Sequence, residues 1–287
     1  MENARVNSLT QEQLYLLNLS SGVWQKRGAA KLSNLPFNEE TITETLLLEL
    51  KTSYPGSVQI VAYNKIQEGQ TGADWLWSFV NSNGSQSFSM LVQAKRLEDK
   101  EQIYPKIKRN IGSRKPPVRQ IDQLISTANS YSMPAVYAFY NHVFDTTRVP
   151  KTCGSLDPTH KGQILGFGIS VADAVAVRSM LPDETFKSHK AHSIPLHCLL
   201  CSQGRGVRPT GGTPEMLALA YNNLPNGVQP EGTERDFVDL HEGLHPVVSR
   251  ALELDAIRAD GGKGFDLDTP SNVAGVIVLK DAQDTKE

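Results

Sequence analysis

The stretch TGADWLWSFVNSNGSQSFSMLVQAKRL, residues 71–97, decides the fold of this chain. On either side of its centre, apolar residues recur with the period of two that is typical of β-strands. The pattern predicts one strand over 73–80 and a second over 88–95. Between them lies Asn83-Gly84, a pair that favours a hairpin turn because both central positions of such a turn take positive φ values. The two strands are therefore predicted to pair antiparallel.

Polar side chains gather at one end of this predicted hairpin. Asp74 stands at the start of the first strand, and Gln93 and Lys95 share one face at the end of the second. A turn centred on Asn83-Gly84 places Asp74 opposite Gln93, whereas a shift of the turn by one residue places it opposite Lys95. In either register a carboxylate, a carboxamide and an ammonium group lie together, with opposed residues about 5 Å apart.

The residues around the hairpin extend it into an α/β unit. The run NEETITETLLLEL over 38–50 carries apolar side chains at helical spacing and predicts a helix. Further patterns predict a strand over 58–63, a helix over 118–130 and a strand over 135–140. The order helix, strand, strand, strand, helix, strand is typical of a compact α/β unit with a mixed sheet.

The rest of the chain gives weaker signals on both sides of this unit, which covers residues 38–142. A helix predicted over 14–22 belongs to an N-terminal helical extension, residues 1–37. Residues 143–287 form a C-terminal α/β elaboration. Its patterns predict strands over 164–169 and 273–279, and helices from about residue 172, over 214–223 and over 246–258.

The composition is that of an ordinary folded protein. The 287 residues are 39% hydrophobic and 21% charged, which excludes the disordered, collagen-like and coiled-coil classes. The best apolar window, 164–177, contains Asp173, so neither a membrane span nor a membrane partner is expected. The first residues lack a secretory signal pattern, and three cysteines are too few for a disulfide framework. Both observations favour the cytoplasm.

The net charge of -2 conceals a strongly basic region. Nine Lys or Arg residues and three acids fall within 95–119, a local excess of six positive charges directly after the second hairpin strand. Because binding of Lys and Arg to phosphates releases condensed counter-ions, this region is predicted to contact a nucleic-acid backbone. The alternative is a solvated loop.

The polar cluster of the hairpin suits metal-assisted hydrolysis of a phosphodiester. Mg²⁺ prefers hard oxygen ligands, and the cluster offers the Asp74 carboxylate, the Gln93 side-chain carbonyl and the Ala94 backbone carbonyl. Such a metal polarises the phosphate and lowers the pKa of the attacking water. Lys95 would position that water or stabilise the charge that builds on phosphorus. Glu44, on the polar side of the preceding helix, is the candidate second acid. The alternative is a surface hairpin in which Asp74 and Lys95 form a cross-strand ion pair.

The series Glu44, Gly72-Ala73-Asp74 and Gln93-Ala94-Lys95 resembles the PD-(D/E)XK nuclease superfamily. The likeness is to the variant with Gln in place of the acid, which is familiar from Mrr-type restriction endonucleases. The strings TGADWLW and LVQAKRL are also similar to an uncharacterised bacterial family known only as restriction-endonuclease-like. The resemblance covers roughly residues 39–140. It implies a restriction-endonuclease-like mixed sheet flanked by helices.

The resemblance implies a role for each residue of the cluster. Asp74 and Gln93 would bind the metal, Lys95 would be catalytic and Glu44 would be the helix acid, with Glu40 and Glu49 as less favoured substitutes. The metal would be Mg²⁺, or Mn²⁺ because the neutral Gln93 binds a cation more weakly than a carboxylate does. The expected activity is that of a metal-dependent endonuclease.

The resemblance also implies the partners. DNA is expected more than RNA, homodimers are common among such nucleases, and a role in bacterial defence follows by association. The residues expected to contact the nucleic acid are Arg96, Lys106, Lys108, Arg109, Arg114, Lys115, Arg119, Gln120 and Gln123. The competing hypothesis is a catalytically silent nucleic-acid-binding or effector module on the same fold.

Two other motifs suggest zinc, and both are disfavoured. His241-Glu242-Gly243-Leu244-His245 matches the metallopeptidase pattern H-E-x-x-H, which requires both histidines on one helical turn. Gly243 weakens such a helix, and Pro246 is better placed as the first residue of the next one. Cys198 and Cys201, with nearby histidines, have zinc-ligand spacing but lie in an apolar segment that is more simply a buried one.

Overall fold

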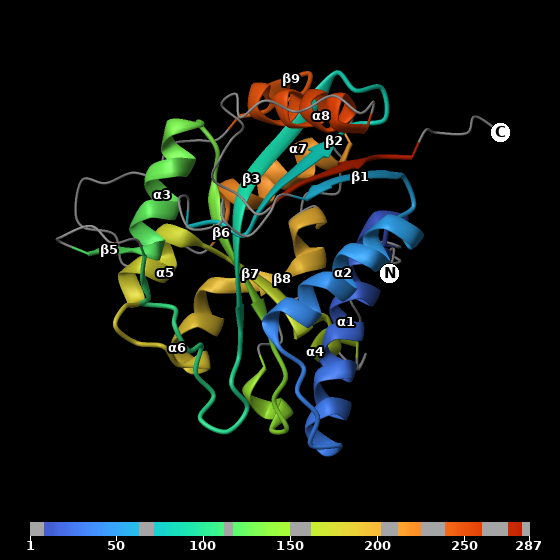
Figure 1. The fold of residues 1–287 in the computed structure, drawn as a ribbon. Coiled ribbons are helices and arrows are strands. Elements are labelled where there is room, and N and C mark those ends of the chain that lie inside the picture. The colour runs from blue at the N-terminus through green and yellow to red at the C-terminus, as the bar shows by residue number, and fades with distance from the viewer. Residues whose placement is uncertain are drawn as a thin grey trace, which may run out of the picture.

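The structure, a computed structural model, describes residues 9–62, 72–111, 117–149, 162–201, 212–224, 239–259 and 275–282. It is a mixed α/β protein whose sheet lies between two groups of helices (Figure 1). The described strands of the main sheet run in the order β1 (Ser57–Ala62), β10 (Gly275–Lys280), β2 (Trp75–Val80), β3 (Gln86–Arg96), β6 (Ala135–Tyr140), β7 (Ile169–Asp173) and β8 (Ser193–Pro195), and β9 (His241–Glu242) pairs with the start of β3. A separate ribbon joins β4 (Asn110–Ile111) to β5 (Val118–Arg119).

The hairpin of β2 and β3 forms as predicted. The strands pair antiparallel from Trp75 opposite Val92 to Val80 opposite Ser87, which is the register that brings Asp74 level with Gln93. The connection is not the two-residue turn that the sequence suggested. Five residues, 81–85, separate the strands, and of the Asn83-Gly84 pair only Gly84 takes a positive φ, of 78°. Asn81 closes the loop by bonding to the backbone of Gly84 and Gln86 instead.

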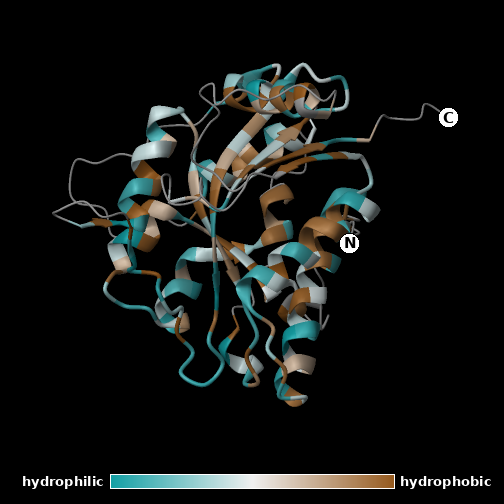
Figure 2. Ribbon diagram, viewed as in Figure 1, coloured by the Kyte–Doolittle hydropathy of each residue, from teal (hydrophilic) through white to brown (hydrophobic). Residues whose placement is uncertain are grey.

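The alternating side chains of the strands divide the core into two layers. The helices α3 (Gln120–Ser130), α5 (Ala174–Met180) and α8 (Pro246–Ala259) cover one face, and α1 (Gln11–Leu32), α2 (Glu39–Ser53) and α7 (Thr213–Asn222) cover the other. In β6, Tyr137 and Phe139 belong to the first layer, whereas Val136 and Ala138 belong to the second. Figure 2 shows the resulting hydrophobic strands and a hydrophilic segment where the chain leaves β3.

The order of strands contains one arrangement that the sequence did not indicate. β10, from the C-terminal part of the chain, lies between β1 and β2, antiparallel to the first and parallel to the second. Gly275 permits this, because a Cβ at that position would lie only 2.3 Å from a ring atom of Trp75. β7 and β8 also extend the sheet beyond β6, so strands from both sides of residue 142 form one sheet.

Two predicted elements were wrong in extent or kind. The first helix continues through Gly22 to Leu32, since nothing lies within 4 Å of the place where a Cβ on Gly22 would stand and no proline follows until Pro36. The strand predicted over 164–169 is instead a short helical segment, α4 (Gly162–Leu165) with a 3-10 turn over Gly166–Gly168, and the strand begins at Ile169. Gly168 lies against the backbone of Ser20 in α1, which fixes this turn in place.

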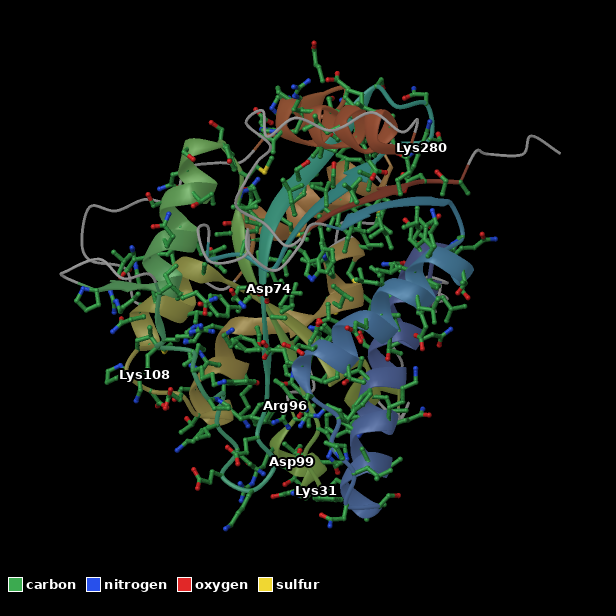
Figure 3. The ribbon with its side chains drawn as sticks, in the orientation of Figure 1. Lys31, Asp74, Arg96, Asp99, Lys108 and Lys280 are labelled. Carbon is green, nitrogen blue, oxygen red and sulfur yellow. The ribbon has the colours of Figure 1, made fainter. Side chains whose placement is uncertain are left out.

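A buried arginine ties α1 to the sheet. Arg27 is 3% exposed, and its guanidinium donates to the carbonyl oxygens of Tyr140 at 2.5 Å and Leu97 at 2.6 Å and to the Asp99 carboxylate at 2.9 Å. Burial lowers the pKa of Arg27, and the charge of Asp99 opposes that shift. Leu97 directly follows β3 and Tyr140 ends β6, so one side chain fixes both strand ends. Asp99, the carboxylate partner of Arg27, also lies near Lys31 (Figure 3).

Among the described helices, none combines the length and the apolar character needed to cross a membrane.

Candidate active site

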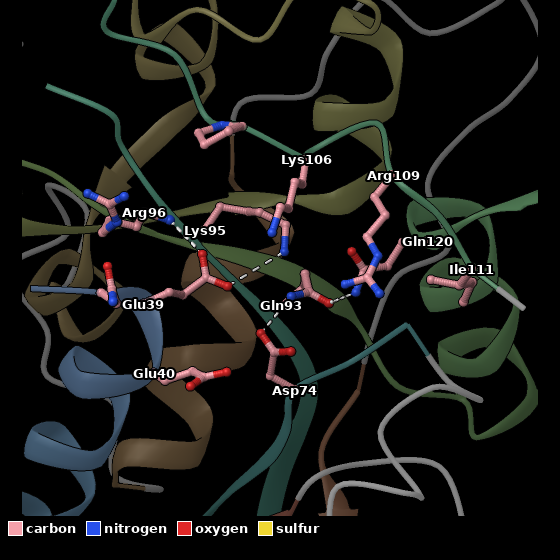
Figure 4. Close-up of a pocket in the computed structure, with 12 residues that line it drawn as sticks. Glu39, Glu40, Asp74, Gln93, Lys95, Arg96, Lys106, Arg109, Ile111 and Gln120 are labelled. Carbon is pink, nitrogen blue, oxygen red and sulfur yellow. Dashed lines mark hydrogen bonds and ion pairs between the residues drawn. The ribbon is translucent and has the colours of Figure 1, made fainter. Parts of the chain in front are cut away.

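A polar cavity of about 590 Å³ opens at the end of the hairpin where the sequence placed its cluster. It lies where the first turn of α2, the end of β3, the segment after β3 and the first residue of α3 meet (Figure 4). The residues that line it are Asn38, Glu39, Glu40, Asp74, Gln93, Lys95, Arg96, Pro105, Lys106, Arg109, Ile111 and Gln120.

Asp74 extends the hairpin by one residue ahead of Trp75, the first residue of β2. Its backbone N–H donates to the Val92 carbonyl at 2.9 Å, as the next residue of the strand would. Its Oδ2 accepts from the backbone N–H of Ala94 at 2.7 Å and from Nε2 of Gln93 at 2.6 Å. Two donors on one oxygen hold the carboxylate in place at the cavity.

Gln93 is buried, with 1% exposure, and its carboxamide is fixed at both ends. Nε2 donates to Asp74 and also approaches the Ala94 carbonyl oxygen at 3.1 Å, and Oε1 accepts from Nε2 of Gln120 at 2.7 Å. The carbonyl oxygen that the sequence offered as a metal ligand therefore faces Gln120 and not Asp74. This orientation follows because a carboxamide beside an ionised carboxylate presents its N–H groups to it.

Lys95 lies with its ammonium group at the cavity although the residue is only 5% exposed. Its Nζ is 3.9 Å from Oε1 of Glu39. Oε2 of the same carboxylate accepts from the backbone N–H of Arg96 at 2.8 Å. Glu39 thus holds both the end of β3 and the lysine side chain in place (Figure 4).

The acidic residues that α2 contributes to the cavity are Glu39 and Glu40, not Glu44. Glu44 lies one turn beyond Glu40, is exposed and does not line the cavity. The physical reason is the position of the helix start. α2 begins at Glu39 and its N-terminal end meets the cavity, where the orphan N–H groups favour negative charge. Glu49, the other substitute considered, forms an ion pair with Lys26 on α1.

The backbone at Gly72, two residues before Asp74, requires a glycine. Its φ is 75°, and a Cβ there would lie 2.4 Å from the backbone oxygen of Gln120. Only glycine combines that conformation with that contact. The residue thereby lets the N-terminus of α3 pack against the chain two residues before Asp74, which brings Gln120 to Gln93.

The basic segment that follows β3 is anchored, not a loosely solvated loop. Tyr104 and Ile107 are 1% and 0% exposed, and the Tyr104 hydroxyl donates to the side chain of the buried Asn141 at 2.7 Å. Lys106, with a φ of 67°, and Arg109 project from this anchored backbone to line the cavity. Within the described ranges neither of these two forms an ion pair.

The other residues expected to contact nucleic acid divide into three groups. Arg96 and Gln120 line the cavity with Lys106 and Arg109. Lys108 pairs with Glu184 at 3.3 Å, Arg119 with Asp122 at 2.6 Å, and Gln123 donates to Thr127 at 3.3 Å, so these three interact elsewhere. Arg114 and Lys115 lie outside the described residues.

Tyr137 is a neighbour of the site that the sequence analysis missed. It pairs with Gln93 across β3 and β6 and is completely buried. Burial raises the pKa of its phenol, and the charges of Asp74, Asp122 and Glu39 raise it further. The sequence predicted a strand over 135–140, but the place of Tyr137 beside Gln93 depends on a strand pairing that no local pattern specifies.

The structure removes the basis of the metallopeptidase motif. His241 and Glu242 form β9, and His245 precedes α8, which begins at Pro246 as predicted. Nε2 of His245 is 2.9 Å from the Tyr131 carbonyl, and its Nδ1 accepts from the backbone N–H of Val247 at 3.3 Å. Over the described residues no group of three or more metal-binding side chains of the His, Cys, Asp and Glu types is present. Sγ of Cys198 lies 3.6 Å from Nε2 of His197, and Sγ of Cys201 donates to the His197 carbonyl oxygen at 3.7 Å.

The fold and the cavity together define a mixed α/β protein with a charged site at the end of a central hairpin. Residues 12–283 match the model of the family of unknown function DUF6615, and the chain belongs to that family. No curated protein matches the chain.

Proposed function

We propose that this protein is a divalent-metal-dependent nuclease that hydrolyses phosphodiester bonds in DNA on a restriction-endonuclease-like core. The observation that carries the proposal is the meeting of Asp74, Gln93 and Lys95 in one cavity that Lys106 and Arg109 also line. Acidic residues of the cavity could bind a metal ion, and its basic residues could bind the phosphate that the metal contacts. A cavity lined only by acidic residues would suit the metal ion alone.

The donor set fits Mg²⁺ or Mn²⁺. Asp74 offers a carboxylate, Ala94 a backbone carbonyl and Gln93 a carboxamide, and Glu40 adds a second carboxylate at the cavity wall. All are hard oxygen donors of the kind that Mg²⁺ selects. When bound there, the metal would supply Lewis-acid polarisation of the phosphate and a water of lowered pKa.

The protein's own residues would stabilise the transition state and position the DNA. Lys95, held beside Glu39, places a positive charge where negative charge develops on the phosphate in the transition state. Lys106 and Arg109 would bind the neighbouring phosphates and orient the scissile bond. Because Glu39 pairs with Lys95 and the Arg96 backbone, it acts as a positioning residue for the lysine.

We expect purified protein to cut supercoiled plasmid in Mg²⁺ or Mn²⁺ and not in EDTA. Lys95→Met keeps the bulk of the buried side chain but removes its charge, and we expect it to lower the cleavage rate by about 10²–10³-fold. Agarose electrophoresis of timed reactions measures this. The matched control is Lys187→Met, a lysine outside the cavity on the short helix α6 (Phe186–His189), which should cut at the wild-type rate. Cleavage in EDTA, or full activity of Lys95→Met, would refute the proposal.

We expect DNA binding to depend on the cavity cations and less on the paired ones. In EDTA, the double variant Lys106→Ala/Arg109→Ala should reduce the slope of log Kd against log salt by about 1.8, since each phosphate contact contributes about 0.9. Lys108→Ala/Arg119→Ala removes the same charge, but its side chains are engaged with Glu184 and Asp122, and the slope should fall by less than half as much. Fluorescence anisotropy measures both slopes between about 50 and 200 mM salt, a range over which the Debye length falls by about half. Equal slopes for the two double variants would contradict the assignment.

The same pair of experiments separates the competing function. A catalytically silent binding module would retain the salt-dependent binding and its loss in Lys106→Ala/Arg109→Ala. It would show no metal-dependent cleavage in any variant.

A further inference from the structure

The side-chain nitrogen of Gln93, Nε2, lies close to two hydrogen-bond acceptors. Asp74 Oδ2 lies 2.6 Å and the Ala94 carbonyl oxygen 3.1 Å from Gln93 Nε2. A hard cation that binds these two oxygens would meet the amide nitrogen, which has no lone pair to give it. To become a ligand, Gln93 must turn its carboxamide by a half-turn so that Oε1 replaces Nε2.

The same half-turn replaces the acceptor that Gln93 presents to Gln120 by a donor. In the structure Oε1 accepts from Nε2 of Gln120 at 2.7 Å. After the half-turn Nε2 of Gln93 would stand there, opposite another N–H donor. Gln120 can resolve that conflict, because its own Oε1 is buried and has no hydrogen-bond partner among the described residues. Rotation of the Gln120 carboxamide brings this oxygen to Gln93.

We propose that Gln120 is a positioning residue that turns in concert with Gln93, so that the pair forms a two-state switch for cation binding. In one state Gln93 donates to Asp74 and accepts from Gln120. In the other state Gln93 presents its oxygen beside Asp74 and Ala94 and donates to Gln120. Three oxygens that face one another repel unless a cation lies between them, so the cation favours the second state. The inference rests on the metal site of the proposed function.

The local packing leaves the pair few alternatives to this coupled turn. Gln93 is 1% exposed, so a hydrogen bond lost at either end would leave a nearly buried polar group unpaired. Gln120 is the first residue of α3, and its backbone N–H donates to the Arg109 carbonyl at 2.8 Å. Gly72 packs against the backbone carbonyl of Gln120. The backbone of Gln120 is therefore fixed, and its side chain can adapt to Gln93 only by rotation.

The test observes the two side chains directly. Protein labelled with [¹⁵N]glutamine gives side-chain amide signals, and those of Gln93 and Gln120 are assigned by their absence from Gln93→Met and Gln120→Met. We expect a titration with Mg²⁺ to move both signals along one saturation curve. Movement of the Gln93 signal without that of Gln120, or movement of neither, would overturn the proposal.

A second variant fixes one state. In Gln120→Glu the side chain only accepts, so Gln93 should donate to residue 120 before any cation is present. Its amide signal in metal-free protein should then lie where the wild-type signal lies at Mg²⁺ saturation. Mn²⁺ measured by calorimetry should bind about tenfold more tightly, the equivalent of one hydrogen bond. Ser126→Glu adds the same charge on an exposed position of α3 and should change the affinity by less than about twofold. A metal-free Gln93 signal at the wild-type metal-free position would contradict the switch.

The outcomes distinguish this inference from the proposed function. Signals that move together in a protein that cuts no DNA would support the switch and refute the nuclease. Metal-dependent cleavage with immobile signals would support the nuclease and refute the switch.

Discussion

Replacing Asp74 by Asn is expected to impair the proposed metal-dependent cleavage severely and to leave the fold intact. Asp74 lies at the start of the β2–β3 hairpin and is the carboxylate that the proposed metal site depends on most. Asparagine keeps an oxygen that can accept from the Ala94 N–H but removes the negative charge. We expect a loss of at least about 10²-fold in cleavage rate, because an uncharged ligand set holds Mg²⁺ weakly. Timed plasmid cleavage at fixed Mg²⁺ measures the effect.

Two further variants test whether the loss of cleavage rate is due to the metal site and not to reduced stability or to the removal of any nearby charge. Asp74→Ala removes the acceptor as well and leaves the Ala94 N–H without it, so its melting temperature should fall while that of Asp74→Asn should not. Asp122→Asn neutralises a carboxylate on α3 that pairs with Arg119 and does not line the cavity, and it should cut at the wild-type rate. Wild-type cleavage by folded Asp74→Asn would rule out the proposed metal site.

Replacing Arg27 by Met destabilises the whole protein. The substitution keeps an unbranched side chain but leaves the Leu97 carbonyl and the Asp99 carboxylate without the charged donor that the structure gives them. The loss of a buried charged partner costs about 3 kcal/mol of unfolding free energy. In a chain of this size that corresponds to a fall of about 5 °C in melting temperature. Thermal unfolding followed by circular dichroism measures it.

Lys31 provides the matched control for Arg27. It lies on the same helix and 3.9 Å from the same Asp99, but its side chain is 40% exposed. Lys31→Met should change the unfolding free energy by no more than about 1 kcal/mol, as is usual for exposed pairs. Equal stability of the Arg27→Met and wild-type proteins would mean that the buried contacts of Arg27 contribute nothing net.

The sequence predicted the parts of the site that depend on local alternation. The period of two in residues 73–80 and 88–95, together with the Asn83-Gly84 pair, was sufficient to predict an antiparallel hairpin with Asp74 opposite either Gln93 or Lys95, and the structure has the first of these two registers. That pairing needs no information from distant residues. The helix over 39–53 was predicted for the same reason, since its apolar stripe is local.

The features that the sequence did not reveal depend on contacts between distant segments. Which glutamate of α2 reaches the cavity depends on where the helix starts and on how it meets β3, and this favours Glu39 and Glu40 over Glu44. The orientation of the Gln93 carboxamide depends on Gln120, which lies 27 residues away. The placement of β10 between β1 and β2 depends on strands more than 190 residues apart, as the pairing of Gly275 with Trp75 shows.

The position of β10 has a consequence for how the molecule is made. A ribosome produces residues 275–280 after every other described strand, yet these residues form an inner strand of the sheet, between β1 and β2. Until they emerge, β1 has no neighbour in the sheet and the outer edge of β2 is bare. Pairings of such long sequence separation form slowly, and an open edge invites association with other chains. The nascent chain therefore passes through an incomplete sheet, and the strand that carries Asp74 gains its second neighbour only in the last step of assembly.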